Sequence, residues 1–295
     1  MSGVETLGRV LPVVALRQRR GWLRRALRTG PLVCGSAILA LVVIIALMAP
    51  ILFPGNPNDM VDVPAQWPGE SAATPLGTDS MGRDVAAGLA YGARVSLLVG
   101  ISSAVIGLLI GTTVGAIGGY FGGWTDRILA RLTIIFQTIP SFLLVIVIVT
   151  IATPSAAIIA LAIGVASWPT VARLVRAQYR SLRAQDFVMA ARSLGYSAPR
   201  IIVCEILPNA LPPIVVTTSV MVANAILIEA GLSFLNLGDA NLISWGSMIG
   251  DGRALLRTAW FLTALPGSAI ALTVLSLNLI GDGLNEVLNP RAGKE

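Results

Sequence analysis

The residues of this 295-residue chain that could do chemistry are few. The sequence has no histidine, which removes the usual general base, the commonest metal ligand and any Ser-His-Asp arrangement. Its single lysine is Lys294, so the Gly-Lys-Ser/Thr end of a phosphate-binding P-loop cannot be formed. Cys34 and Cys204 lie in different predicted elements and are not expected to pair. We therefore expect no catalytic residue, no metal ligand and no cofactor-binding residue in this chain.

Glu229 is the only acid well inside an apolar stretch of the sequence. An ionisable side chain at membrane depth is a functional candidate by default, because burying a charge there is costly. Its position near one end of the stretch also fits a structural role at the membrane interface. Both interpretations stay open at this point.

Uncharged polar residues recur at helical spacing in two apolar stretches, one of which also holds Glu229. Residues four or seven apart share one face of a helix. Such side chains turn away from lipid, toward hydrogen-bond partners on other helices or toward a water-filled path. With Glu229, the candidates for a pore lining are therefore Thr133, Gln137, Ser141, Thr217 and Asn224.

The elements that carry these residues are predicted to cross a membrane. The chain is 55% hydrophobic and only 12% charged, whereas soluble domains carry about 25% charged residues. Five long stretches contain no charged residue, and one of them is long enough for two spans. Backbone groups in lipid must be satisfied internally, so these spans should be helical. We predict an all-α polytopic membrane protein with about six transmembrane helices: 31–53, 93–118, 130–152, 155–176, 209–234 and 259–281.

The first span could also be a cleaved signal peptide, since a basic segment precedes it. Its apolar run from Leu32 to Phe53 is longer than the 7–15 residues of a signal core, which favours an uncleaved anchor. The chain then divides into a basic segment 1–30, the first helix 31–53, a loop 54–92, a core domain 93–285 and a tail 286–295.

The arginines indicate how the chain sits in the membrane. They concentrate in alternate connections, as the positive-inside rule requires of cytoplasmic ones. Both termini and the 177–208 loop are predicted to be cytoplasmic, and the 54–92 and 235–258 loops external, in a bacterial plasma membrane. The basic terminus would contact lipid. A nucleic-acid surface is the alternative for the net charge of +6, but the distribution of the arginines over alternate connections favours a membrane topology.

Small residues four apart follow one face of the second span. They are Ser103 and the glycines Gly107, Gly111, Gly115 and Gly119. Small residues at this spacing let another helix approach closely, which is how helices associate in lipid. We predict a packing ridge here; a ridge that slides during gating is the alternative.

The loop after the fourth span has its own helical pattern. Asp186 is a good N-cap, and apolar residues then recur at helical spacing up to Leu194. Gly195 can end this helix in the left-handed conformation, Ser197 can cap a second short helix, and Pro208 marks the entry to the fifth span. This predicts a helix-turn-helix whose apolar face needs a partner. A helix lying on the membrane surface is the alternative.

The loop carries a resemblance to a known family. The spacing of Ala190-Ala191, Gly195 and Leu207-Pro208 resembles the "EAA" loop of ABC importer permeases. The stretches Pro75–Asp84, Tyr91–Ser96, Gly118–Asp126, Gly231–Leu235, Ser244–Gly246 and Asn278–Leu284 are similar to those of permeases for dipeptides, oligopeptides and nickel. The resemblance covers about residues 30–290 and is closest to the second of the two permeases in such systems.

The resemblance implies a type I ABC importer permease fold and half of a translocation pathway for dipeptides or oligopeptides. It implies as partners a homologous permease, an extracytoplasmic solute-binding protein and two ABC ATPase subunits, which bind ATP and Mg. The loop 183–208 would dock into the ATPase and tilt the fifth helix, so that inward-open and outward-open states alternate. The residues that this implies for coupling are Asp186, Met189, Ala190, Ala191, Gly195, Leu207 and Pro208.

Three positions depart from the family pattern. Met189 stands where the loop often has Glu, Asn236 replaces a common Gly, and Ile134 stands where relatives often carry Asp. An importer of the same family for nickel or another small solute is an alternative. An ion-coupled secondary transporter and a membrane-embedded enzyme are more distant ones, because buried acids or histidines at mid-membrane are nearly absent.

Overall fold

The protein was analysed as a computed structural model that describes residues 29–288. Nearly all of the predicted basic segment 1–30, and most of the predicted tail 286–295, lie outside these residues. Within the described range the chain is helical and forms no β-sheet; two isolated bridges, Met60–Arg83 and Thr78–Asp84, order the loop before the second long helix. The elements are α2 (Gly30–Leu52), α3 (Val85–Phe121), α4 (Gly123–Thr138), α5 (Ser141–Ile151), α6 (Ala156–Leu182), α7 (Asp186–Ser193), α8 (Ala198–Arg200), η1 (Ile201–Ile206), α9 (Leu207–Phe234), α10 (Trp245–Gly252), η2 (Arg253–Leu255) and α11 (Phe261–Leu288).

Among residues 29–288, five helical segments are long and apolar enough to cross a membrane, and a bent pair of helices makes up to six. This confirms the predicted number of spans. Several helices extend beyond the predicted bounds; α3 starts at Val85 rather than residue 93, where Asp84 caps it by accepting a hydrogen bond from the Ala86 N–H at 2.8 Å. Charge-free stretches mark only the lipid-facing part of a helix, whereas caps in the polar region decide where it ends.

The prediction of one continuous helix over 130–152 is wrong. The structure breaks this span into α4 and α5, which meet at an angle of 83°. Ile139 between them is extended, with φ −88° and ψ 124°. Proline disfavours helical geometry in the residue before it and lacks an N–H for the helix ladder, so Pro140 accounts for the break. Consequently Thr133 and Gln137 do not share one helix face with Ser141.

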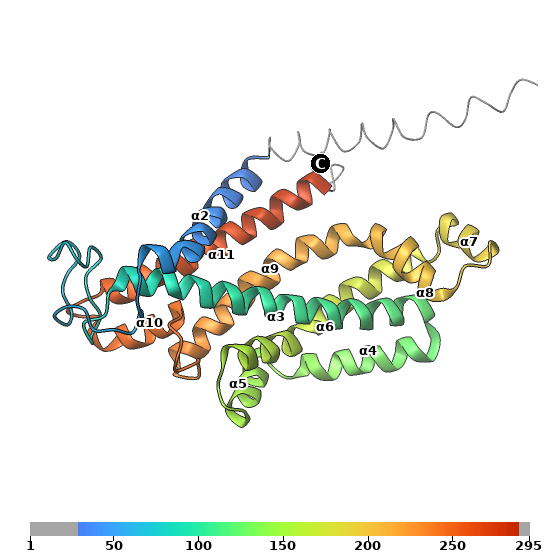
Figure 1. The fold of residues 1–295 in the computed structure, drawn as a ribbon. Helices are drawn as coiled ribbons and strands as arrows, with labels where there is room; N and C mark the ends of the chain where they lie inside the picture. The colour runs from blue at the N-terminus through green and yellow to red at the C-terminus, as the bar shows by residue number, and fades with distance from the viewer. Residues whose placement is uncertain (1–28, 289–295) are drawn as a thin grey trace, which may run out of the picture.

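The glycine ridge of α3 packs against α6 along most of both helices, as predicted. Figure 1 shows the two helices lying side by side through the centre of the molecule. A methyl group at Gly111 would lie 2.5 Å from the Cβ of Val171, and one at Gly115 would lie 2.6 Å from the Ala172 carbonyl oxygen. A methyl group at Gly107 would overlap the Ser167 hydroxyl, and one at Gly119 would overlap the Cβ of Tyr179. The ridge therefore brings the two backbones together where no side chain fits.

A second close pairing joins the first and last helices. α2 and α11 run side by side and diverge from the other helices toward the chain termini (Figure 1). A methyl group at Gly35 would lie 2.6 Å from the Ser276 carbonyl oxygen, and one at Gly283 would lie 2.6 Å from the Cβ of Leu32. The sequence analysis did not single out these glycines, because they lie on different helices and form no repeat.

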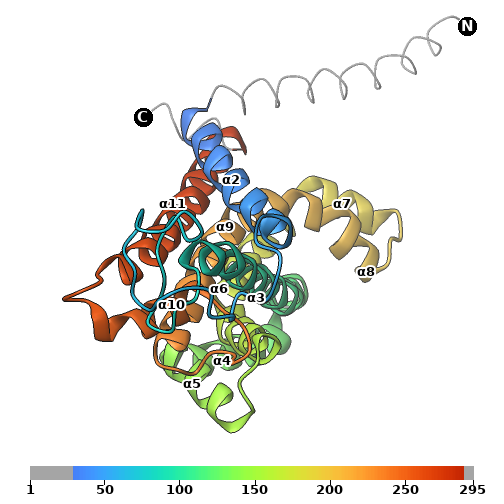
Figure 2. The same ribbon diagram turned by 60° about the vertical axis from the view of Figure 1, so that its left-hand side comes forward.

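The non-spanning elements gather at opposite ends of the helix bundle. At one end α7 and α8 project beyond the bundle, and Figure 2 shows them standing out to one side of the helices. At the other end the loop 53–84 folds beside α10 (Figure 1). We call these the α7 end and the α10 end.

The close contact between α3 and α6 predicts that a larger residue in the glycine ridge will destabilise the protein. Gly111→Ala should lower the thermal unfolding temperature of the detergent-purified protein, since overpacking a close contact costs about 1–3 kcal/mol. Gly118→Ala is the matched control on the same helix, because its methyl group would come no nearer than 3.4 Å to any atom. Equal unfolding temperatures for the two variants would show that α3 and α6 do not approach closely at Gly111.

Candidate functional site

The loop at the α7 end is built around a tight turn at Gly195. This residue has a φ of +76°, in the left-handed region that glycine adopts without strain, as predicted. Its N–H donates to the Arg192 carbonyl at 2.9 Å, and the Tyr196 N–H donates to the Ala191 carbonyl at 3.1 Å. These bonds end α7. The prediction that Asp186 is the N-cap is wrong by one residue: Gln185 occupies that position and Asp186 lies in the first turn, where its charge favours the helix dipole.

The two faces of α7 differ in their surroundings. Val188 is 0% exposed and Ala191 5%, because both pack against the chain's own helices. Met189 is 51% exposed and Leu194 72%, and Ala190 is also exposed. Of the residues assigned to coupling, Ala191 therefore faces inward, whereas Met189, Ala190 and Gly195 lie on the open side. At the start of α9, Leu207 packs on the core and Pro208 is exposed.

The short second helix expected after Ser197 is instead the start of a long one. Residues Ala198–Phe234 form one helical segment of 37 residues, so Pro208 lies inside it rather than at its entry. The turn before Pro208 is a π-helix, in which the Leu207 N–H donates to the Ile202 carbonyl. The wider turn accommodates a residue that has no N–H, and the helix continues through it. α7 is thus separated from the whole of α9 only by the turn at Gly195.

Charged contacts secure the α7 end, and sequence reasoning missed them. The Arg176 guanidinium forms an ion pair with Asp126 of α4, with Nη2 and Oδ2 2.7 Å apart. Arg183 donates to the Tyr120 carbonyl at 2.7 Å, and the Arg192 guanidinium lies 5.2 Å from the centre of the Tyr120 ring. The arginines had been interpreted only as topology signals, and their partners are 50 or more residues away in the chain.

Two of the pore-lining candidates meet at a cavity. Ser141 of α5 and Asn224 of α9 line a volume of about 380 Å³ together with Ser167 and Thr170 of α6. The break at Pro140 brings Ser141 there. Three other candidates do not line this cavity. Thr133 of α4 is buried and donates to the Leu129 carbonyl at 2.7 Å, Thr217 of α9 donates to the Pro213 carbonyl at 2.9 Å, and Gln137 of α4 is exposed.

Glu229 does not line this cavity. Its side chain is 2% exposed. The carboxyl accepts hydrogen bonds from the Ser96 hydroxyl of α3 at 3.0 Å and from the Ser233 hydroxyl of α9 at 2.7 Å. The alternative of a structural role fits this arrangement, because the carboxyl joins α9 to α3 through hydrogen bonds that are strong at low dielectric.

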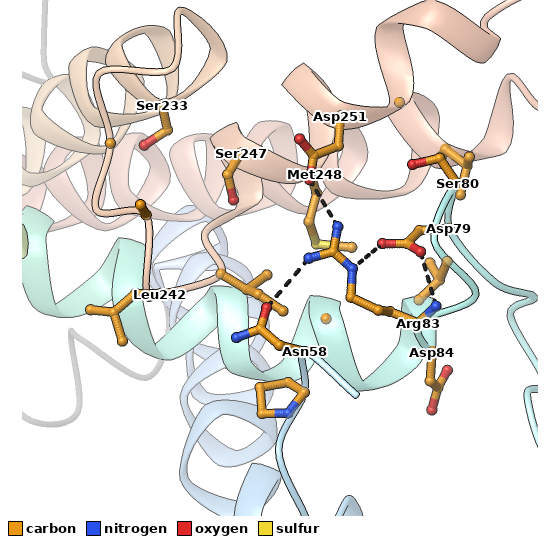
Figure 3. A pocket seen from close by; sticks show the side chains of 18 of the residues that line it. Asn58, Asp79, Ser80, Arg83, Asp84, Ser233, Leu242, Ser247, Met248 and Asp251 are labelled. Atoms are coloured by element: carbon orange, nitrogen blue, oxygen red, sulfur yellow. Dashed lines mark hydrogen bonds and ion pairs between the residues drawn. The ribbon is translucent and has the colours of Figure 1, made fainter. Parts of the chain in front are cut away.

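At the α10 end a pocket of about 210 Å³ lies between the loop 53–84 and α10. Figure 3 shows the Arg83 side chain at its centre. Its guanidinium contacts Asp79 at 2.6 Å, Asp251 at 3.1 Å and the Asn58 side-chain oxygen at 3.3 Å. Burial raises the pKa of the nearby Asp84 carboxyl, against the lowering effect of the backbone N–H groups of Ala86 and Ala87. Arg83 and Asp251 are 168 residues apart, and no motif or spacing in the sequence indicates their contact.

The chain matches a known protein family over most of its length. Residues 107–294 match the family described as "Binding-protein-dependent transport system inner membrane component". The match spans more than half of the chain. The protein belongs to this family.

Its relatives include several peptide permeases. The permease is 41% identical to a probable peptide ABC transporter permease of Sinorhizobium fredii over 91% of this chain and 92% of that one. It is 40% identical to a dipeptide transport system permease of Alkalihalophilus pseudofirmus over 88% and 85% of the two chains. It is also 37% identical to a di/tripeptide transport system permease of Pseudomonas aeruginosa over 87% of each. The predicted resemblance to ABC importer permeases is confirmed.

The fold has a counterpart among solved structures. A chain from the inward-facing MetNI methionine ABC transporter superposes with a TM-score of 0.55 and 18% identity, and the match covers 66% of this chain and 94% of that one. At this identity the likeness concerns the fold alone. It confirms the predicted permease fold, and the permease is a multi-pass membrane protein.

The link through Glu229 makes a second prediction. Glu229→Leu should lower the thermal unfolding temperature, because two buried hydroxyls lose their acceptor at about 1–3 kcal/mol each. Glu229→Gln is the matched control, since it keeps the size and one acceptor oxygen and should lose less. If the leucine variant is as stable as wild type, the carboxyl does not hold α3 and α9 together.

Proposed function

We propose that the permease forms one half of the translocation pathway of an ATP-driven peptide importer and is coupled to its ATPases through the loop 183–208. The observation that supports this most directly is the segment Ala198–Phe234. It is one helical segment of 37 residues that starts beside the open face of α7 and carries Asn224 at the cavity. Motion of α7 would therefore reach the cavity through the turn at Gly195 and one continuous helical segment. The peptide names of relatives at 37–41% identity support the cargo class.

The open side of α7 fits a surface that a partner covers. Met189, Ala190 and Leu194 are exposed on an element that stands away from the bundle (Figure 2). An ATPase that grips this face would pull α7 against the turn at Gly195, and the π-turn and α9 would follow as a rigid body. The Tyr179 hydroxyl, which donates to the Ile202 carbonyl at 3.1 Å, holds the π-turn to α6 and would limit that motion.

Nucleotide chemistry is assigned to other subunits. The single lysine, Lys294, cannot complete a P-loop, so ATP and Mg would be bound by the two ATPases and this chain would be non-catalytic. A homologous permease would complete the pathway, and an extracytoplasmic solute-binding protein would deliver cargo at the α10 end. In this arrangement the α7 end and both termini are cytoplasmic, in the bacterial plasma membrane.

The docking face can be tested by a charge placed on it. Leu194→Asp should abolish or strongly reduce co-purification of the ATPase subunits with the tagged permease, because it puts a charge where an apolar contact is expected. Leu256→Asp is the matched control: this leucine is also exposed but lies at the α10 end. Undiminished co-purification with Leu194→Asp would contradict docking at α7.

The orientation can be tested by labelling cysteines in intact cells. In a Cys34→Ser background the remaining Cys204, which is exposed at the α7 end, should react with an impermeant maleimide only after the membrane is opened. A cysteine placed at Ser80, which is exposed in the loop at the α10 end, should react in intact cells. Labelling of Cys204 from outside would reverse the proposed topology.

A further inference from the structure

Three polar side chains from three helices converge on one cavity with their hydrogen-bonding groups open. Asn224 of α9, Thr170 of α6 and Ser141 of α5 line the cavity of about 380 Å³. All three are exposed, and none forms a side-chain hydrogen bond with another residue in the range 29–288. The volume is within the range of about 300–1,000 Å³ that is typical of ligand pockets.

Several other polar side chains on the spanning helices are satisfied within their own helix. The hydroxyls of Thr113, Thr133 and Thr217 each donate to a carbonyl one turn earlier, at 2.7–2.9 Å. Such bonds remove the cost of about 1–3 kcal/mol for an unmet hydrogen bond at low dielectric. The groups at the cavity therefore need another partner, which is either water or something that passes through.

The hydrogen-bonding groups that line the cavity indicate which kind of ligand would bind there. A side-chain amide and two hydroxyls can both donate and accept hydrogen bonds. Each peptide bond presents one donor and one acceptor, so a peptide main chain matches them. Ser167 also lines the cavity; the other lining residues are apolar: Phe142, Ile163, Ala166, Leu227 and Ile228. None of these described residues carries a charge that could attract or repel a cargo side chain.

We propose that this cavity is a cargo subsite that binds the peptide main chain through Asn224, Thr170 and Ser141 and does not discriminate between charged side chains. The inference rests on the proposed function, since it requires that the permease carries peptides. It assigns any charge preference of the importer to the solute-binding protein. A charge introduced into the cavity should then create a preference that the wild-type permease lacks.

The test compares two peptides in the complete importer. The complex is purified through a tag on this permease and reconstituted in vesicles with its solute-binding protein, and uptake of Ala-Lys-Ala and Ala-Glu-Ala is measured. Asn224→Asp should raise the Lys/Glu uptake ratio at least about tenfold over wild type. Attraction of the lysine and repulsion of the glutamate, with charges about 10 Å apart at an effective dielectric of about 20, would together allow a change of about two-hundredfold. Because the receptor is the same throughout, its own preference cancels from this comparison.

A control and a second variant make the outcome decisive. Asn285→Asp adds the same charge at an exposed asparagine of α11 outside the cavity and should leave the ratio unchanged. Thr170→Asp tests the same cavity from α6 and should raise the ratio as Asn224→Asp does. If neither aspartate variant assembles, Asn224→Leu should lower uptake of tri-alanine at least about fivefold, the equivalent of one lost hydrogen bond.

The results separate this inference from the proposed function. If the wild-type complex transports neither these peptides nor tri-alanine, the proposed function fails and the subsite fails with it. If wild type transports them but an assembled aspartate variant shows the wild-type ratio, cargo does not contact the cavity and the subsite alone is overturned. Full tri-alanine uptake by Asn224→Leu would overturn it in the same way.

Discussion

The glycine face of α3 lies against the backbone of α6, and most other features of the molecule take their positions from this contact. α6 carries Thr170 at the cavity and Tyr179 at the α7 end, and Arg183 follows it directly, while α3 supplies the serine that bonds Glu229. Lipid is as apolar as the side chains it surrounds, so the hydrophobic effect does not hold two such helices together. Close van der Waals contact does, and it requires that side chains be absent on one of the two surfaces. The fold therefore depends on glycines rather than on large core residues.

Pro140 breaks a helical span, whereas the helix continues through Pro208, and the backbone just before each proline accounts for the difference. At Pro140 the preceding residue is extended and the span breaks, which turns α5 away from α4 by 83° and brings Ser141 to the cavity. At Pro208 the preceding π-turn absorbs the missing donor, and the helix continues from Ala198 to Phe234. Breaking the span creates a site between helices, whereas continuing the helix joins the α7 end to that site. The broken span and the continuous helix both fit a transporter in which movement of α7 is coupled to a path through the membrane.

Polar groups inside the bundle fall into two classes by their partners. Glu229 and the helix threonines are satisfied by other groups of the chain, so they stabilise the permease. Asn224, Thr170 and Ser141 are open, and such groups are available for cargo. At the α10 end Arg83 ties the loop 53–84 to α10 through Asp251, which fixes the surface where cargo would arrive (Figure 3). Position in the sequence did not separate these classes, because it left both roles of Glu229 open and did not single out Thr170.

The sequence by itself determined the class of protein, the number of spans, the packing ridge of α3 and the turn at Gly195, because each depends on local residue type and spacing. It also indicated the family through the loop around Ala190 and Ala191, which the comparisons confirm. The broken span, the π-turn before Pro208, the inward side of Ala191 and the contacts of Glu229 and Arg83 were decided only by tertiary structure. The long-range contacts of Glu229 and Arg83 join residues more than 100 positions apart, and such contacts produce no periodic pattern in the sequence. The effect of each proline depends on the backbone geometry around it, which residue type alone does not specify.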